Sequence, residues 1–172
     1  GFPAGLVMES SGTIRDDDTV RVALDFDGVI ASDESERVFQ DGGGLPAFHQ
    51  NEVEKRTVPL ERGPLSEFLR DLNMVQEIER AHLETNPEYR TRLRVSIVTA
   101  RNAPAHERAV KTLEEWGVTV NDAFFLGGID KGAILKVMQP DIYFDDQKGH
   151  LESTSKYAAS VHIPYGIANE RP

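Results

Sequence analysis

The stretch VRVALDFDGVI at Val20–Ile30 decides the fold, because an apolar segment of β-strand character runs directly into two aspartates and a glycine. Val20–Leu24 has the β-branched, apolar composition of a strand buried on both faces, which is typical of parallel sheets. Asp25 and Asp27 follow at its carboxyl end, and Gly28 lets the backbone turn closely. Two carboxylates held together predict a cation site of the kind that Mg²⁺ prefers. Taken alone, the pattern is equally compatible with a strand that ends in an aspartate-rich turn.

The size and composition of the chain are those of an ordinary globular protein. Its 172 residues suit one well-filled core, so we expect residues 1–172 to form a single domain. No run approaches the about 20 apolar residues of a membrane span, and the amino terminus has no basic segment followed by an apolar core. We therefore expect a cytoplasmic protein without a membrane partner.

Charge and cysteine content narrow the classes of function. The net charge of −10 argues against a nucleic-acid partner, because such proteins normally carry a basic surface. The absence of cysteine excludes disulfides, thiolate metal sites and a thiol nucleophile. A small phosphorylated substrate is compatible with this charge if a few cations are placed close to it. The sequence does not fix the oligomeric state, and a homo-oligomer is compatible with it.

Strand-like and helix-like segments alternate after the first strand. Further strands are predicted at 93–99, 123–126, 141–144 and 160–163. Helices are predicted after Pro64, after a cap at Asn102, after a cap at Asp130, and at 150–158. The core-facing residues of the first two are Leu65, Phe68, Leu69, Leu72, Val75 and Ile78, and then Ala109, Val110, Leu113 and Trp116. Repeated strand–helix–strand units predict an α/β three-layer sandwich around a parallel, Rossmann-like sheet.

Residues 31–62 depart from this alternation. The segment is rich in Asp, Glu and Gly, and Gly42-Gly43-Gly44 interrupts it. Phe39, Leu45 and Phe48 are its scattered apolar residues. We expect a small, partly helical lid inserted after the first strand.

Polar residues follow several predicted strands at the edge where ligands of parallel sheets bind. They are Asp25 and Asp27 after the first strand, Thr99 after the second, Lys131 beyond the third, and Asp145 and Asp146 after the fourth. Each has an ordinary alternative: Asp145-Asp146 as a solvated turn, Lys131 as a surface lysine, Thr99 as a helix cap. Their joint placement at one edge favours a phosphoryl-transfer site.

The chemistry of such a site assigns a role to each residue. Asp25 can attack phosphorus to form an aspartyl-phosphate, while Asp27 protonates the leaving oxygen and then deprotonates water. Thr99 can bind phosphate oxygens, and Lys131 can neutralise the charge of the transferring group.

A magnesium site completes this scheme. We expect Mg²⁺ to be held by Asp25, the main-chain carbonyl of Asp27 and Asp145. Asp146 would hold a metal-bound water or orient Lys131.

The order of these motifs resembles that of the haloacid dehalogenase superfamily. Asp27, the second aspartate of the first motif, makes the chain similar to the phosphatases of that superfamily. Within it, the chain is similar to the cytosolic 5′-nucleotidase type I family over roughly Val20 to Ile167. The most specific words are Ser32-Asp33-Glu34-Ser35-Glu36 and Phe144-Asp145-Asp146-Gln147; the others are Gly63-Pro64-Leu65, Ile97-Val98-Thr99-Ala100-Arg101, Lys131-Gly132 and His162-Ile163-Pro164-Tyr165-Gly166.

The resemblance implies a haloacid dehalogenase-like fold and a Mg²⁺-dependent 5′-nucleotidase acting on AMP or deoxynucleotides. The expected substrate-binding residues are Ser32, Asp33, Thr99, Ala100, Arg101 and Lys131. Arg101 would either reach the phosphate or pin the lid to the sheet. Phe48 would either stack on the base or form lid core.

Two other functions remain open. A phosphatase of the same fold could act on another small phosphomonoester such as a sugar phosphate, and a non-catalytic domain could keep only the fold. The presence of the full set of site residues favours catalysis. A receiver-type signalling domain is disfavoured, because its phosphorylated aspartate follows a strand in the middle of the chain, whereas Asp25 follows the first predicted strand along the chain.

Overall fold

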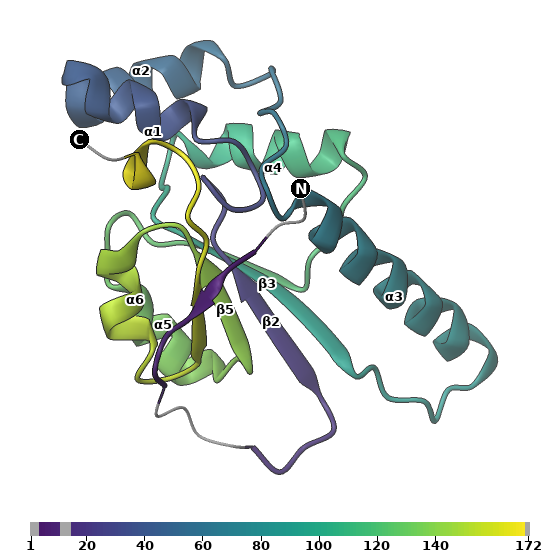
Figure 1. The fold of residues 1–172 in the computed structure, drawn as a ribbon. Coiled ribbons are helices and arrows are strands. Elements are labelled where there is room, and N and C mark those ends of the chain that lie inside the picture. The colour runs from purple at the N-terminus through teal and green to yellow at the C-terminus, as the bar shows by residue number, and fades with distance from the viewer. Residues whose placement is uncertain (1–3, 11–14, 171–172) are drawn as a thin grey trace.

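The strand predicted from the opening stretch is β2 (Val20–Leu24), and it lies inside a six-stranded sheet with the order β1-β6-β5-β2-β3-β4 (Figure 1). The computed structural model describes residues 4–10 and 15–170. β2 pairs in parallel with β3 (Leu93–Thr99) on one side and with β5 (Ile142–Asp145) on the other. Asp25 therefore follows a central strand, between two neighbours whose carboxyl ends meet it.

The remaining strands extend the sheet at both edges. β4 (Asp122–Phe125) pairs in parallel with β3, and β6 (Ala159–His162) pairs in parallel with β5. These strands confirm the predicted ones to within one residue at each end. The two-residue β1 (Leu6–Val7) was not predicted and pairs antiparallel to β6, so the sheet is mixed at this edge instead of purely parallel.

Helices cover both faces of the sheet and confirm the three layers. One face packs Val22 and Leu24 of β2 with α3 (Ser66–Thr85) and α4 (His106–Glu115). The other packs Ala23 with α5 (Lys131–Met138) and α6 (Lys148–Thr154). This alternation along β2 explains the apolar run in the sequence, since successive side chains of a strand point to opposite faces.

The insertion (residues 31–62) is largely helical. It contains α1 (Glu34–Val38), the π-helix η1 (Phe39–Gly43) and α2 (Gly44–Glu54). Figure 1 shows α1 and α2 beyond the carboxyl ends of the strands, beside the short helix η2 (Ile167–Asn169) near the carboxyl terminus. The insertion thus stands on the same side as the predicted site.

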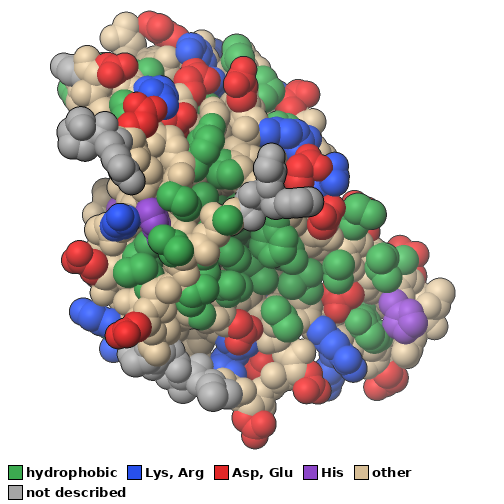
Figure 2. Space-filling view, viewed as in Figure 1, with side chains coloured by type: hydrophobic (Ala, Val, Ile, Leu, Met, Phe, Trp, Pro, Cys, Tyr) green, Lys and Arg blue, Asp and Glu red, His purple; other side chains and the backbone are tan. Residues whose placement is uncertain are grey.

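The prediction that α3 turns Phe68, Val75 and Ile78 to the core is wrong. Val75 and Ile78 are 46% and 68% exposed, and Phe68 is 36% exposed. Besides Ser66, the helix buries three polar side chains that bind the loop before β4 and the start of β3: Asn73 binds Thr119, Gln76 binds Asn121, and Glu79 binds the N–H groups of Arg92 and Leu93. Figure 2 shows hydrophobic side chains gathered in the middle of the viewed surface.

The predicted start of α4 also needs correction. Its amino-terminal cap is Ala105, without a side-chain hydrogen bond, and the side chain of Asn102 lies 3.3 Å from His49 instead. Val110 is 40% exposed because the buried stripe of α4 runs through Arg108, Ala109, Thr112 and Leu113. In contrast, the predicted cap of α5 is confirmed, since Asp130 accepts a hydrogen bond from the N–H of Gly132.

Within residues 4–10 and 15–170, none of the helices combines the length and the apolar character that a bilayer span requires.

Candidate active site

A cavity of about 430 Å³ lies at the carboxyl ends of the parallel strands, below the insertion. Asp25, Asp27, Thr99, Ala100 and Arg101 contribute to its wall, as the sequence predicted. The insertion supplies Glu36, Phe39, Leu45 and Phe48, the loops after β3, β4 and β5 supply Asn102, Gly127, Gly128 and Gln147, and α6 supplies His150. The cavity therefore joins a carboxylate-rich floor to a partly apolar wall.

Lys131 bridges two of the predicted site residues. Its ammonium group lies 2.7 Å from Asp25 and 2.8 Å from Asp145, and all three side chains are almost fully buried. Burial raises the pKa of Asp25 to about 6, which Asp145 and Asp27 reinforce and the Lys131 ammonium only partly offsets. Burial works against the charge of Lys131 as well, but Asp25 and Asp145 outweigh it and raise the pKa of the ammonium. Lys131 therefore stays charged beside the candidate nucleophile.

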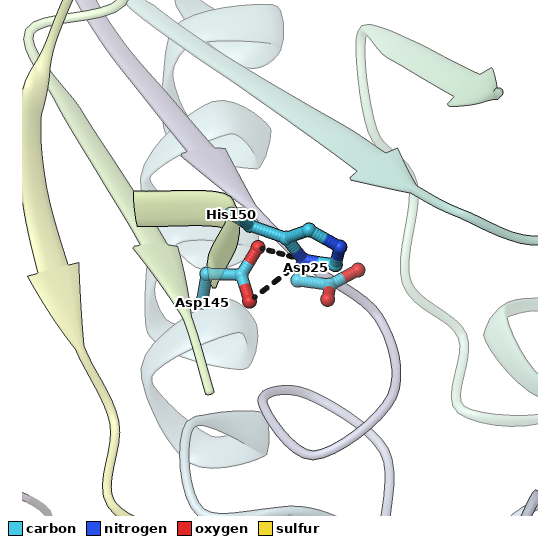
Figure 3. Close-up of side chains that lie close together, drawn as sticks. All are labelled: Asp25, Asp145 and His150. Carbon is cyan, nitrogen blue, oxygen red and sulfur yellow. Dashed lines mark hydrogen bonds and ion pairs between the residues drawn. The ribbon is translucent and has the colours of Figure 1, made fainter. Parts of the chain in front are cut away.

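Asp145 is fully engaged with protein groups. One carboxylate oxygen accepts from Lys131 and from the hydroxyl of Tyr143, and the other accepts from the N–H of Gln147 at 2.8 Å. Figure 3 shows the ring of His150 against the same carboxylate, with Nδ1 3.1 Å from Oδ2. Burial disfavours ionisation of Asp145, but Lys131 and His150 outweigh it and hold its pKa far below the usual range. The Asp145 carboxylate is thus held in its ionised form beside Lys131.

Asp146 presents the opposite situation. Its side chain is buried, and its Oδ1 has no hydrogen-bond partner among the described residues. Burial, reinforced by Asp25 and Asp145, raises the pKa of Asp146 to about 9. A buried carboxylate without a partner is costly, and a cation is the group that would satisfy it. Carboxylate oxygens are ligands that a hard divalent ion prefers.

Gly28 makes the position of Asp146 possible. The glycine has φ +71°, and a Cβ there would lie 2.5 Å from Oδ2 of Asp146. No other residue could bring its backbone so close, so the glycine of the opening stretch and the second aspartate of the Asp145-Asp146 pair form one unit.

A second set of ligand atoms is also close enough for a metal. One atom each from Asp25, Asp145 and His150 lie within 4.8 Å of one another (Figure 3). The oxygens of Asp145 in this set already accept hydrogen bonds from Lys131, Tyr143 and Gln147. The unpartnered oxygen of Asp146 is therefore the better candidate for a ligand, which exchanges the roles that the sequence suggested for the two aspartates.

The side chain of Asp27 is held by Arg101. Nε and Nη2 of Arg101 donate to the two oxygens of the Asp27 carboxylate, each at 2.7 Å. The Asp27 side chain is 19% exposed, whereas that of Arg101 is 1% exposed. The bidentate pair fixes the plane of the candidate acid/base at the edge of the cavity.

The other predicted residues divide into two groups. Thr99 is a buried part of the cavity wall, and its Oγ1 accepts from the N–H of Arg101 at 3.3 Å. Ser32 and Asp33 are buried outside the cavity wall. Asp33 pairs with Arg37 at 2.9 Å and accepts from the N–H of Ile167 at 2.7 Å, so its carboxylate ties α1 to the carboxyl-terminal segment.

Several residues of the site escaped the sequence analysis. Glu52 and Arg108 are fully buried beside Arg101, and Tyr143 and His150 both lie against the carboxylate of Asp145. His150 could have been found from its place three residues after the Asp145-Asp146-Gln147 word. Nothing in the sequence around Glu52 and Arg108 indicates that they are buried, because charged residues in helical segments are usually exposed.

Another cavity, of about 440 Å³, lies at the opposite edge of the sheet near the amino ends of β2, β3 and β4. Its charged side chains pair with their neighbours, Arg94 with Asp122 and Arg21 with Asp17. It lacks an unpartnered charge of the kind seen at Asp146.

The sheet order, the aspartates after the central strand and the buried lysine–aspartate bridge define a haloacid dehalogenase-like protein. The chain belongs to the 5′-nucleotidase family, whose model matches residues 1–170. It is similar to human cytosolic 5′-nucleotidase 1B, with 38% identity over 141 residues, which cover 81% of this chain and 22% of that protein. The chain thus spans about a fifth of the length of this relative. No solved structure shows a significant match.

Proposed function

We propose that this protein hydrolyses nucleoside 5′-monophosphates, such as AMP or deoxynucleotides, to nucleoside and phosphate. One observation carries the proposal: Asp25 and Asp27 lie on the wall of a cavity to which the insertion contributes Phe39, Leu45 and Phe48, and the buried Lys131 lies 2.7 Å from Asp25. The floor suits a phosphate group, and the wall suits the base of a nucleotide. The family match supports the same reaction.

In the first half of the proposed reaction, a carboxylate oxygen of Asp25 attacks phosphorus and the bond from phosphorus to O5′ breaks. Lys131, 2.7 Å from Asp25, keeps positive charge beside the nucleophile and the transferring group. Asp27 gives its proton to O5′, so that the nucleoside leaves as an alcohol. The product on the protein is an aspartyl-phosphate at Asp25.

In the second half, the Asp27 carboxylate takes a proton from water, and the water oxygen attacks the same phosphorus. The acyl–phosphate bond breaks and restores the Asp25 carboxylate, while inorganic phosphate leaves. Thr99 contributes to both halves, because its oxygen accepts from the N–H of Arg101 and its hydroxyl proton can be donated to a phosphate oxygen.

We further propose that Asp25, the main-chain carbonyl of Asp27 and Asp146 hold Mg²⁺. Bound there, the ion would neutralise charge on the phosphate oxygens and orient the group for in-line displacement. Asp145 keeps Lys131 in place from the other side, at 2.8 Å. The support for Asp146 as a ligand is its buried, unpartnered oxygen against Gly28.

The nucleoside would lie against Phe39, Leu45 and Phe48 of the insertion. Phe39 and Leu45 are 43% and 53% exposed, which leaves apolar surface for a base to cover. Asn102 and Gln147 on the cavity wall offer polar groups to its edge. The human relative is described as cytosolic, and we propose the same compartment for this chain.

The test is a phosphate-release assay across nucleoside monophosphates, sugar phosphates and p-nitrophenyl phosphate, with Mg²⁺ and with EDTA. We expect release from nucleotides that requires Mg²⁺ and is lost in Asp25→Asn. Activity that survives chelation or this substitution would contradict the mechanism. Release from sugar phosphates but not from nucleotides would assign the site to another phosphomonoester.

A further inference from the structure

A chain of alternating charges runs from Asp27 into the insertion. Arg101 binds Asp27 and Glu52, Arg108 binds Glu52 and Glu34, and Lys55 closes the series on Glu34. Glu52, on α2, is 0% exposed, and the side chains of both arginines are 1% exposed. The candidate acid/base is thus connected to the insertion through buried ion pairs.

Arg101 has no donor left for a substrate. A guanidinium carries five N–H groups. Nε and one N–H of Nη2 bind Asp27, the other N–H of Nη2 binds Ser35 at 2.8 Å, and Nη1 binds Glu52 and the carbonyl of Ala105. With this complement filled, Arg101 fits a role in orienting Asp27 better than a role in binding phosphate.

Glu52 determines where that guanidinium lies. Its Oε2 accepts from Arg101, and its Oε1 accepts from Ser35 at 2.8 Å and from Arg108 at 2.9 Å. Burial opposes the charge of Glu52, but Arg101, Ser35 and Arg108 outweigh it, so the pKa of Glu52 lies below its usual value. Glu52 therefore stays ionised in the interior and holds the side of Arg101 opposite to Asp27.

We propose that Glu52 is a positioning residue for Asp27, acting through Arg101 and supported by Ser35. The inference rests on the proposed function, because it concerns the proton that Asp27 gives to the leaving oxygen. Because Arg101 binds both oxygens of the Asp27 carboxylate, the remaining lone pairs of Asp27 lie in one plane. Glu52 fixes that plane by holding Arg101 from the insertion. Docking of α2 against the sheet and orientation of the acid/base then become one event.

The step most sensitive to this positioning is protonation of the leaving group. An adenosine leaving group needs the proton of Asp27, whereas p-nitrophenolate leaves without one. The experiment compares both substrates in single-turnover reactions with enzyme in excess, so that only formation of the aspartyl-phosphate is measured. The variants are Glu52→Gln and Ser35→Ala, and the matched control is Glu54→Gln, an exposed glutamate on the same helix.

We expect E52Q to slow release of adenosine from AMP by about tenfold or more and release of p-nitrophenol by less than about twofold. S35A, which removes one hydroxyl and no charge, should slow adenosine release about fivefold. E54Q should match the wild type on both substrates. Circular dichroism and thermal unfolding show whether E52Q folds. If it does not, S35A serves as the test, because it leaves the ion pairs of Arg101 and Arg108 in place.

A double-mutant cycle with Asp27→Asn distinguishes positioning of Asp27 from a merely structural role of Glu52. If Glu52 acts through Asp27, E52Q causes no further loss on AMP in the D27N background. Equal losses on both substrates, or losses that multiply in the double variant, would overturn the inference and leave the proposed function standing. A wild-type protein that releases no phosphate from any nucleotide would instead refute the proposed function, and the inference with it.

Discussion

A Cβ atom at position 28 would lie 2.5 Å from Oδ2 of Asp146, so Gly28 and Asp146 occupy a contact that only glycine permits. Gly28 also has φ +71°, where an alanine is strained. We predict that Gly28→Ala destabilises the protein by about 1–3 kcal/mol and displaces Asp146. The Mg²⁺ concentration that gives half-maximal activity should then rise.

Gly149→Ala is the control for this prediction, since a Cβ there meets nothing within 4 Å. Its free energy of unfolding should stay within about 0.5 kcal/mol of the wild type. Urea unfolding and a Mg²⁺ titration of activity check both variants. A G28A protein with an unchanged Mg²⁺ requirement would argue against Asp146 as a ligand.

Lys131→Met should lower the free energy of unfolding far more than the same substitution at an exposed lysine. The substitution leaves the buried carboxylates of Asp25 and Asp145 facing each other without the ammonium between them. Removal of one partner of a buried ion pair costs about 3–5 kcal/mol, and we expect a loss of this size in EDTA. Lys136→Met, on the exposed side of the same helix, is the control. Similar unfolding free energies for the two variants would refute this account of Lys131.

Asp146 should make the stability of the metal-free protein depend on pH. Its pKa of about 9 in the folded protein lies above the ordinary value of 3.8, so the unfolded chain binds fewer protons between these values. The contribution of Asp146 to the unfolding free energy is therefore present at pH 4 and is lost as the pH rises toward 9. Asp146→Asn should abolish this part of the slope, whereas Asp41→Asn, at an exposed position, should keep it.

Chemical unfolding in EDTA at pH 5, 7 and 9 measures the effect. Saturating Mg²⁺ should flatten the wild-type slope, because a bound cation keeps the carboxylate ionised in the folded state. Asp145→Asn serves as the contrast. It should destabilise the metal-free protein, because Lys131, Tyr143 and His150 lose the charge that they bind. Identical pH slopes for the wild type and D146N would rule out this explanation.

The strands and the edge of the sheet that carries the site could be predicted because their signals are local. The apolar composition of a segment such as Leu93–Thr99 is enough to predict a buried strand. The carboxyl ends of parallel strands lie at the same edge of the sheet wherever such strands pair. Asp25, Asp27 and Thr99 therefore reach one cavity, as the sequence indicated.

The remaining features depend on partners far away along the chain. Glu52 is buried because it pairs with Arg101 and Arg108, 49 and 56 residues away, and nothing in the pattern of α2 reports this. The polar face of α3 turns inward for the same reason, since Asn73 and Gln76 bind groups about 46 and 45 residues away. The different roles of the adjacent Asp145 and Asp146 likewise depend on a distant partner, because only Asp145 accepts a hydrogen bond from Lys131.

Phe48 provides the prediction that separates nucleotide recognition from phosphate chemistry. Its ring is half-buried on the cavity wall, and the guanidinium carbon of Arg101 lies 5.5 Å from the ring centroid. Phe48→Ala should raise the KM for AMP by about tenfold, since stacking on a base is worth about 1–3 kcal/mol. The KM for p-nitrophenyl phosphate should change much less, because that substrate has no base to stack. Phe39→Ala, at the more exposed part of the same wall, should give a smaller effect. Steady-state kinetics on both substrates measure these values, and a proportional rise in both KM values would place Phe48 in the packing of the insertion instead.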